Sequence, residues 1–368
     1  MVYTIPPRLV KVITEYLAAR YLPERIRRCK EGGFNKKDIA FFARGAGRLS
    51  EAFTIGRSLL PKDYFNLKEY RTGYILYFLI PNYLKLRFCL SEAGHLKEGS
   101  RILDIGAGPA TTALAASDIS RDIEIVAVDR NRHILEDGMR LVSMYARGKV
   151  LFKSVCMEIN PKSIRRFKFE PPFDHIILSN VLSEMGLLEE RKALIFQLMG
   201  MLKDDGTIIL IEPALQKTTR ELMRLRDLVV AEGVHVVSPC LGGSSCPMLV
   251  ANKRDWCHMY LEWERPEIIE EVDRLIGNKK DYIKFSYLIL SRRAVGRQKG
   301  LYRVVSSPIF SKGRIDILLC GGSPLTLERL VELEREKRAV RGMVSLADLK
   351  RGELVLYDGR TLKRFGRG

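Results

Sequence analysis

No uninterrupted apolar stretch in this 368-residue sequence approaches the roughly 20 residues that a membrane-spanning helix needs. Residues 1–22 lack the apolar core and the cleavage site of a signal peptide. The seven cysteines are an odd number in so long a chain and do not form a disulfide framework. We therefore expect a soluble protein of a reducing compartment, cytoplasmic, or in the mitochondrial matrix if the source is eukaryotic, with no membrane partner.

Acidic residues are scarce: 44 Asp and Glu stand against 62 Lys and Arg, and the net charge is +18. Residues 1–95 hold 17 basic and 8 acidic residues, and residues 279–368 hold 21 and 9, so the flanks carry +9 and +12 around a middle of −3. Positive flanks around a nearly neutral centre are typical of proteins that grip a polyanion. The distribution predicts nucleic-acid binding.

Helical periodicity dominates residues 1–95, where apolar residues such as Leu9, Ile13 and Tyr16 recur every three or four positions. A kink or break is expected at Pro81. Strand-like and helix-like segments then alternate, which predicts a doubly wound parallel sheet. The expected strands are 101–106, 123–129, 150–155, 173–179 and 207–212, with helices at 109–117, 133–146, 189–202, 218–232 and 266–275, and later strands at 285–291, 301–305 and 314–320.

A short acid–glycine motif follows the first of these strands. Asp104 precedes Gly106 and Gly108 at the carboxyl edge, where open α/β sheets bind ligands. A dehydrogenase fingerprint would have a third glycine near position 111, where this chain has Thr111. A carboxylate before the glycines suits a cationic amino-acid ligand better than a pyrophosphate, and the glycines let the backbone approach that ligand.

Further polar residues complete this pocket. Asp129 ends the second strand, where a carboxylate can accept both ribose hydroxyls. Glu158 or Met157, after the third strand, would border an adenine, and Ser179, at the end of the fourth strand, is a further cofactor-binding candidate. Together these residues describe an S-adenosylmethionine site; the alternative is a Rossmann-like scaffold whose pocket has decayed. The fold class expected is α/β, a Rossmann-like class I methyltransferase sheet.

The residues that would act on a substrate are less evident. The fourth strand lacks the Asn/Asp-Pro-Pro-aromatic run that aligns an exocyclic amine. Ser183 and Glu184 follow it and could orient a substrate or cap the next helix, and capping is favoured. We name no catalytic residue.

Four cysteines, Cys240, Cys246, Cys257 and Cys320, lie after this core. Thiolates on Gly- and Pro-rich loops with one distant closing ligand suit an iron–sulfur cluster or a structural zinc. The alternative is four unrelated buried thiols. Core positions are expected for the other three cysteines, which are Cys29, Cys89 and Cys156.

The chain resembles the methyltransferase-like small-ribosomal-subunit assembly proteins, known from mitochondria and with archaeal and bacterial relatives, over roughly residues 70–350. The Pro-Cys, Cys-Pro and Trp-Cys-His elements around the first three of these cysteines, together with the late Cys320, are specific to that family, and the core motifs are generic. The generic and flanking matches are Gly73, Tyr74, Pro81, Tyr83, Asp104 to Pro109, Val181 to Glu184, Ile211 to Pro213 and Phe285 to Leu290. Two departures, Leu241-Gly242 after the first cysteine and Met259 to Leu261 after His258, affect the loops rather than the ligands.

The resemblance implies a [4Fe–4S] cluster on the four cysteines, S-adenosylmethionine binding, and association with small-subunit rRNA and the small ribosomal subunit; DNA binding is not expected. An assembly factor, an active rRNA methyltransferase and, less in keeping with four closing ligands, a radical S-adenosylmethionine enzyme remain as alternatives. We expect four regions: residues 1–95, helical and basic; 96–235, the cofactor-binding core; 236–325, the cysteine loops and last core strands; and 326–368, a basic extension.

Overall fold

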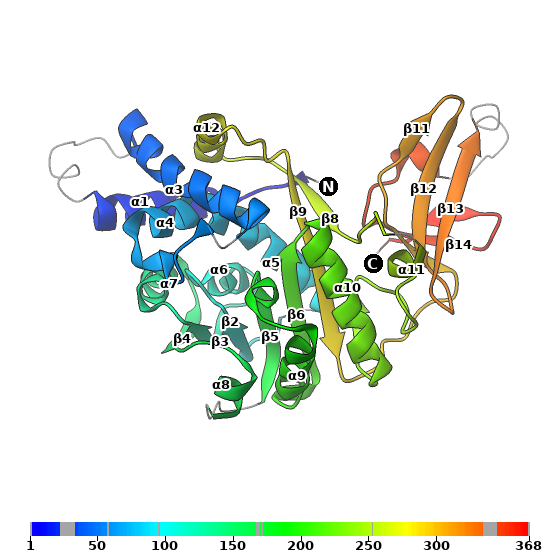
Figure 1. The fold of residues 1–368 in the computed structure, drawn as a ribbon, viewed down its shortest axis with the longest axis horizontal. Helices are drawn as coiled ribbons and strands as arrows, with labels where there is room; N and C mark the ends of the chain where they lie inside the picture. Colours follow the sequence, from blue (N-terminus) through cyan, green and yellow to red (C-terminus); the bar gives the residue numbers. More distant parts are fainter. Residues whose placement is uncertain are drawn as a thin grey trace. The chain divides into compact units, whose positions relative to one another are not determined.

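A computed structural model describes residues 2–22, 34–56, 59–94, 96–166, 170, 172–251, 253–333 and 344–366 (Figure 1). The chain divides into two compact units. Unit 1 comprises Met1–Val181 and Leu261–Ile283, and unit 2 comprises Leu182–Tyr260 and Lys284–Gly368. These units differ from the four regions expected from the sequence, because a segment near residue 270 returns to the N-terminal unit.

Unit 1 contains a parallel sheet with the strand order β4-β3-β2-β5. Its strands β2 and β5 are apolar and almost wholly buried, as expected for a sheet covered on both faces. The strand order reverses between β2 and β5, so the crevice at their carboxyl ends is the expected ligand site. The bounds are β2 (Ser100–Ile105), β3 (Asp122–Asp129), β4 (Lys149–Cys156) and β5 (Phe173–Ser179). The predicted α/β fold with a mostly parallel sheet is confirmed.

Helices connect these strands and precede them. The crossover helices are α6 (Thr111–Ser117), α7 (Arg132–Tyr145) and α8 (Pro161–Arg166). The N-terminal region is helical as predicted, with α1 (Pro7–Tyr21), α3 (Lys36–Ile55), α4 (Lys68–Gly73) and α5 (Leu79–Ala93). In unit 1 a short strand, β1 (Val2–Tyr3), also runs parallel to β8 (Met259–Trp263), and α12 (Glu267–Ile276) follows.

Helices α3 and α4 cross with their backbones in contact, and two glycines allow this. A Cβ added to Gly45 would lie 2.1 Å from the carbonyl oxygen of Glu69, and one added to Gly73 would lie 2.5 Å from the backbone nitrogen of Ala46. No side chain fits at either position without moving a helix. Gly45 and Gly73 therefore allow α3 and α4 to pack closely among the N-terminal helices, which are seen at the blue end of Figure 1.

The irregularity expected at Pro81 falls on the turn before it. Residues Tyr74–Phe78 form a π-helical turn that leads directly into α5, and Pro81 lies in the first turn of α5. Proline has no N–H to donate and its ring crowds the carbonyl four residues earlier, here that of Tyr77. The wider turn makes room for that ring without ending the helix.

Unit 2 contains a group of three antiparallel strands that pair with one another. Strand β9 (Tyr282–Ser291) pairs through its unit 2 residues with β6 (Leu202–Pro213) on one side and with β7 (His235–Ser238) on the other. Two amphipathic helices, α9 (Leu188–Met199) and α10 (Gln216–Ala231), belong to the same unit. The strands and helices expected between positions 189 and 291 are thus confirmed in type and approximate position.

The end of the chain differs from the extension that we expected for residues 326–368. It contains three strands of a second, six-stranded sheet that also includes the expected strands at 301–305 and 314–320. The bounds are β10 (Leu301–Val304), β11 (Ile309–Ser311), β12 (Arg314–Gly321), β13 (Thr326–Leu333), β14 (Leu354–Tyr357) and β15 (Leu362–Arg364). Its core includes Ile315, Ile317 and Leu319 from one face of β12. The boundary expected at 325/326 therefore falls inside the β12–β13 hairpin.

Candidate functional site

The glycine loop between β2 and α6 has a backbone that only small residues tolerate. Gly106 has φ of 71° and Gly108 has φ of 52°, both in the left-handed region. A Cβ on Gly106 would lie 2.2 Å from Cγ2 of Val181, whereas a Cβ on Gly108 would meet open space. The loop is therefore packed against protein at its first glycine and open to a ligand at its second.

Asp104 lies at the carboxyl end of β2, with 2% of its surface exposed. Burial raises the pKa of Asp104 to about 7; the negative charge of Asp129 adds to this rise, and a hydrogen bond from the Thr112 hydroxyl opposes it. A nearby cation would favour the ionised carboxylate. Asp104 is thus a buried acid whose pKa lies near neutral pH, and it is suited to a positively charged ligand group.

Asp129, at the end of β3, is joined to the glycine loop. Its Oδ2 accepts a hydrogen bond from the Gly108 N–H at 2.9 Å, and its Oδ1 accepts one from the Asn131 N–H at 2.9 Å. Burial raises the pKa of Asp129, although these backbone donors oppose the rise. Each carboxylate oxygen has a second lone pair, so Asp129 can still accept hydroxyl groups from a ligand.

The remaining two cofactor candidates lie at the same edge of the sheet. Ser179 ends β5 and is half-buried, and its Oγ accepts a hydrogen bond from Nδ2 of Asn180 at 3.3 Å. Glu158 is exposed, while its neighbour Met157 donates its N–H to the Asp129 carbonyl at 2.9 Å. The structure brings together Asp104, Gly106, Gly108 and Asp129. Within the described residues, no hydrogen bond or ion pair joins the side chain of Glu158 to these four.

Two residues of this pocket escaped the sequence reasoning. Thr112 donates to Asp104, and Asn131 caps α7 by accepting a hydrogen bond from the Ile134 N–H at 3.1 Å. The Asn131 Nδ2 also donates to Oδ1 of Asn66, at 2.8 Å, in the segment before α4. An asparagine directly before a helical stripe is a known N-cap signal and could have been identified. The contact with Asn66 could not, because 65 positions separate the two residues.

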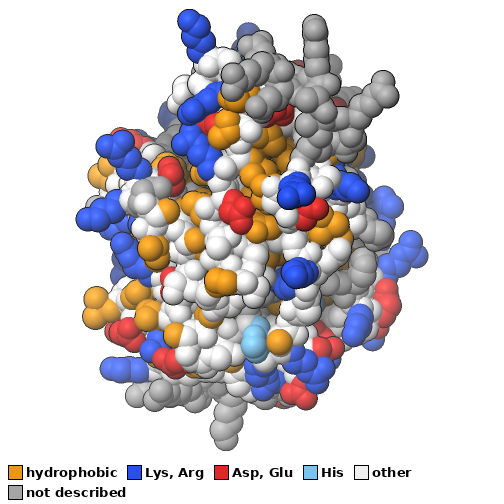
Figure 2. Space-filling model, turned by 90° about the vertical axis from the view of Figure 1, so that its right-hand side faces the viewer, with side chains coloured by type: hydrophobic (Ala, Val, Ile, Leu, Met, Phe, Trp, Pro, Cys, Tyr) orange, Lys and Arg blue, Asp and Glu red, His pale blue; other side chains and the backbone are white. Residues whose placement is uncertain are grey.

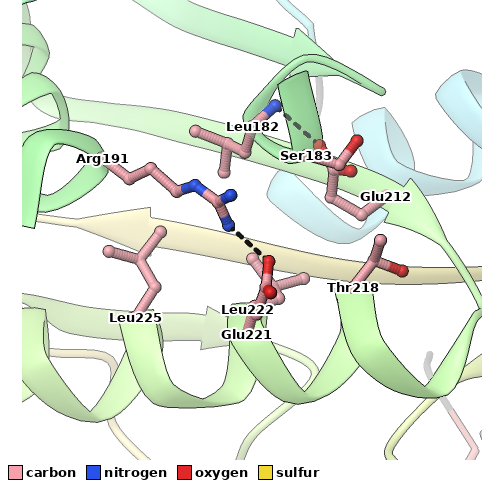
Figure 3. Close-up of a pocket in the computed structure, with 8 residues that line it drawn as sticks. All are labelled: Leu182, Ser183, Arg191, Glu212, Thr218, Glu221, Leu222 and Leu225. Carbon is pink, nitrogen blue, oxygen red and sulfur yellow. Dashed lines mark hydrogen bonds and ion pairs between the residues drawn. The ribbon is translucent and has the colours of Figure 1, made fainter. Parts of the chain in front are cut away.

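A small cavity lies in unit 2 at the segments that follow β5 and end β6 (Figure 3). Its volume is about 10 Å³, enough for one water molecule. Glu212 accepts a hydrogen bond from the Leu182 N–H at 2.9 Å, and Arg191 pairs with Glu221 at 2.8 Å. The expectation that Ser183 and Glu184 cap the next helix is wrong: α9 begins at Leu188 after the N-cap Leu187. The cavity is too small for a nucleobase.

The four cysteines expected to bind metal all belong to unit 2. Cys240 follows β7, Cys246 precedes α11 (Pro247–Ala251), Cys257 precedes β8, and Cys320 lies in β12. Cys246 is buried among Met223, Met248 and Val305, and Cys257 and Cys320 pack against the same cluster. We call these four cysteines the thiol cluster.

The members of the thiol cluster lie close enough for their charges to change one another's pKa. Burial, and then the charge of Cys240, raise the pKa of Cys246 to about 11 and that of Cys257 to about 12. Burial raises the pKa of Cys320 well above its ordinary value, and the charges of the other three cysteines raise it further. Within the described ranges, however, no group of three or more His, Cys, Asp or Glu residues has the arrangement of a metal-ion site.

The other three cysteines are not part of this cluster, and His258 directly follows one of its members, Cys257. Cys89 is buried in α5, as expected, whereas the core position expected for Cys156 is wrong, because this residue is exposed at the end of β4; Cys29 lies outside the described residues. His258 stacks on Trp256, with ring centroids 5.6 Å apart, and its Nδ1 lies 3.1 Å from the Trp256 carbonyl oxygen. Burial lowers the pKa of His258 to about 4, so the ring is neutral at physiological pH.

Arginines hold the loops that carry the thiol cluster. Arg303 is 5% exposed; its Nε donates to the Pro239 carbonyl at 2.8 Å, and its Nη1 donates to the Gly352 carbonyl at 3.0 Å. Arg226, also buried, donates to the Gly242 carbonyl at 2.7 Å. Burying guanidinium groups is costly unless negative charge lies near. Asp227 supplies part of that charge for Arg226, at 2.6 Å from its Nη1, and four thiolates on a metal centre would supply more near both arginines, so the surroundings fit an anionic centre.

The fold and the glycine loop at the end of β2 define a Rossmann-like α/β protein. A family model described as mitochondrial small ribosomal subunit Rsm22 matches residues 72–343, which is most of the chain. The chain belongs to this family. The match agrees with the range of roughly 70–350 inferred from the sequence motifs.

Solved structures with a similar fold include several methyltransferases. A precorrin-6y C5,15-methyltransferase from Geobacter metallireducens is 19% identical, with 56% of this chain and 87% of that chain covered and a TM-score of 0.36. The plantazolicin methyltransferase BpumL, in complex with SAH, is 12% identical, with coverage of 70% and 99% and a TM-score of 0.39. An S-adenosylmethionine-dependent methyltransferase from Thiobacillus denitrificans, with S-adenosyl-L-homocysteine, is 16% identical, with coverage of 57% and 91% and a TM-score of 0.34.

A search of the curated proteins found no match. None of the helices in the described segments is long and apolar enough to cross a membrane.

Proposed function

We propose that this protein binds S-adenosylmethionine, carries a [4Fe–4S] cluster on its four clustered cysteines, and binds small-subunit rRNA to assist assembly of the small ribosomal subunit. The observation that carries the ribosomal part is membership of the small-ribosomal-subunit family over residues 72–343. The protein would be located where the small ribosomal subunit is assembled, which is the cytoplasm, or the mitochondrial matrix in a eukaryote.

The glycine loop supports the cofactor part of the proposal. Asp104 would pair with the amino group of the methionine moiety, Gly108 leaves space for close approach, and Asp129 would accept the ribose hydroxyls. Ser179 and Glu158 would line the outer part of the pocket. S-adenosylmethionine supplies a transferable methyl group when bound, and these residues bind and orient it.

The thiol cluster supports the metal part. Cys240, Cys246, Cys257 and Cys320 are soft ligands, and each of the last three experiences the charge of Cys240. A four-iron cluster is larger than a single ion, so its thiolates stand farther apart than the ligands of one zinc. Structural zinc is the alternative.

Positive charge supports the RNA part. On the face drawn in Figure 2, Lys and Arg side chains project at many separate points, with Asp and Glu between them. The loop that follows β9 is richer in positive charge. Arg292, Arg293, Arg297 and Lys299 are exposed, and residues 292–300 include no acidic residue, although Asp204 lies 3.3 Å from Arg292 and 3.7 Å from Arg293. We call residues 292–300 the basic loop and assign it to phosphate contacts.

An active rRNA methyltransferase is the second candidate, because the pocket retains both acids and both glycines. A radical enzyme is a weaker candidate, since four thiolates would leave no iron open for reductive cleavage.

The first experiment isolates small subunits from a strain that produces the tagged protein and sequences the RNA crosslinked to it. Enrichment of small-subunit rRNA supports the proposal, and crosslinks spread over all cellular RNA contradict it. Comparing rRNA modifications in a deletion strain and its parent then separates the two candidates. One missing methyl group identifies an enzyme, and unchanged modification with defective small subunits identifies an assembly factor.

A further inference from the structure

Arg226, on α10, has a side chain that is 2% exposed and only partly satisfied by hydrogen bonds. Its Nη1 donates to Asp227 Oδ1 at 2.6 Å and to the Ser244 carbonyl, and its Nη2 donates to the Gly242 carbonyl at 2.7 Å. Its Nε is buried and has no hydrogen-bond partner among the described residues. The charges of Cys240 and Cys246 act on this guanidinium.

Arg351 repeats this arrangement from another part of unit 2. Its Nη1 donates to the His258 carbonyl at 3.3 Å, and its guanidinium carbon lies 5.9 Å from the centroid of the Tyr260 ring. Its Nε is likewise buried without a partner in the described part of the chain. The charge of Cys257 acts on this guanidinium.

A buried N–H without an acceptor is costly, and native proteins rarely retain one without a reason. Among the described residues three arginines have a buried Nε without an acceptor, namely Arg191, Arg226 and Arg351. Arg191 lines the small cavity beside Glu221, whereas Arg226 and Arg351 both lie within electrostatic reach of the thiol cluster. The sulfur atoms of metal-bound thiolates and of an iron–sulfur cluster accept N–H hydrogen bonds, and such bonds set the reduction potential of the cluster. A metal centre at the cysteines would therefore supply the missing acceptors.

We propose that the Nε–H groups of Arg226 and Arg351 donate hydrogen bonds to sulfur atoms of the metal centre and that their positive charges raise its reduction potential. This proposal rests on the proposed [4Fe–4S] cluster. A cluster held by four thiolates is anionic and gains one more negative charge on one-electron reduction. Two fixed positive charges therefore favour the reduced state over the oxidised one.

Arg220 provides a matched control on the same helix. It is 9% exposed, and it donates from Nη1 to the Asp255 carbonyl at 2.7 Å and from Nη2 to the Leu249 carbonyl at 3.2 Å. It thus anchors α11 and the loop before Cys257, whereas Arg226 anchors the loop between Cys240 and Cys246. The Nε of Arg220 is not among the buried unpartnered atoms of the described residues. An effect of lost loop anchoring alone should therefore appear in both Arg220→Gln and Arg226→Gln.

The test uses the full-length protein, purified anaerobically, as wild type, Arg226→Gln, Arg351→Gln and Arg220→Gln. Iron content is measured first, and the midpoint potential is then measured by titration with an external reductant while the visible absorbance is followed. At a fixed potential near the wild-type midpoint, we expect Arg351→Gln to lower the ratio of reduced to oxidised cluster about tenfold, or 59 mV for one electron. Arg226→Gln should act in the same direction, and Arg220→Gln should leave the potential unchanged.

The outcomes distinguish the proposed role of the two arginines from the proposed [4Fe–4S] cluster on which it rests. Wild-type protein that contains no iron contradicts the proposed cluster itself. Full iron with wild-type potentials in both Arg226→Gln and Arg351→Gln overturns the arginine proposal alone. If Arg226→Gln does not fold, Arg351→Gln and Arg351→Lys decide. Lysine keeps the charge but lacks Nε–H, so we expect Arg351→Lys to shift the potential, but less than Arg351→Gln does. An unchanged potential in Arg351→Lys would overturn the hydrogen bond, and a shift equal to that of Arg351→Gln would overturn the role of the charge.

Discussion

The glycine-loop pocket and the thiol cluster are built in opposite ways. Asp104, Gly106 and Gly108 come from five consecutive positions, and Asp129 joins them through one backbone hydrogen bond at 2.9 Å. The thiol cluster draws its members from four separate segments, the last of them in the strand β12. The pocket thus depends on local backbone geometry, and the cluster depends on the correct folding of a whole unit. Changes to the two sites should consequently have different effects.

The largest effect is expected for Cys320→Ser, because this residue closes the thiol cluster from a distant strand. Iron content should fall to about half of the wild-type value or less, since ligand assembly and local folding are coupled. Iron analysis and limited proteolysis of unit 2 check this. Cys89→Ser, a change at a buried cysteine of unit 1, is the control and should retain full iron. Equal iron in both variants would show that Cys320 is only a strand residue.

Gly106→Ala should damage the pocket without touching the cluster. The new Cβ would lie 2.2 Å from Val181 Cγ2, in a backbone conformation with φ of 71°. We expect the free energy of unfolding to fall by about 1–3 kcal/mol and S-adenosylmethionine binding to be largely lost. Thermal unfolding and calorimetry measure both effects.

Gly99→Ala is the matched control for that variant. Gly99 has φ of 74°, but no atom lies within 4 Å of its added Cβ. It should therefore show the cost of backbone strain without the clash, and it should bind the cofactor normally. If both variants bind equally well, the close packing at Gly106 has no role in the pocket.

A moderate effect is expected from pH on cofactor binding, because the pKa of Asp104 is about 7 in the free protein. A cationic ligand favours the carboxylate, so binding lowers this pKa and releases a proton. Affinity should therefore rise by about tenfold from pH 6 to pH 8 and level off above that. Calorimetry at several pH values measures this. In Asp104→Asn the dependence should disappear, and a slope that persists there would assign it to another group.

The smallest effect is expected for RNA binding after changes in the basic loop, because each phosphate contact contributes only a small part of the affinity. Replacing Arg293 and Lys299 by alanine should weaken RNA binding and reduce the log–log salt slope by about 0.7 per lost contact on single strands. Filter binding at several salt concentrations measures the slope. Replacing Lys149 and Lys153, two exposed lysines of unit 1, removes equal charge from the nearly neutral middle of the sequence. An equal change in that variant would contradict a specific role for the basic loop.

Local patterns explain what the sequence could predict. The strands of unit 1 are short apolar runs, and the acid–glycine motif follows the first of them, so both the sheet and the pocket were predictable. The strand β13 was not, because Glu328, Arg329 and Glu332 interrupt its apolar residues and give it the composition of a charged tail. Ser183 and Glu184 precede a helical stripe, which favours a cap there, but α9 starts later, at Leu188.

Long-range contacts explain what the sequence could not predict. Arg226 lies on an amphipathic helix, where an arginine is usually solvated, and only the fold shows that it is buried against the Gly242 and Ser244 carbonyls. Arg351 lies more than 90 residues from the His258 carbonyl that it contacts. Neither position carries a local signal of a metal centre. Only the cysteines that we propose as ligands carry such a signal, because Pro239 and Pro247 stand beside two of them in Gly- and Pro-rich loops.

The most direct test of the account is the metal content of the full-length protein purified without oxygen. Iron, acid-labile sulfide and zinc are measured together with protein concentration, and the visible absorbance is recorded. The account predicts about four iron and four sulfide per chain and brown protein with broad absorbance at the blue end of the visible range. One zinc per chain with no iron, or no metal at all, would contradict a [4Fe–4S] cluster on Cys240, Cys246, Cys257 and Cys320.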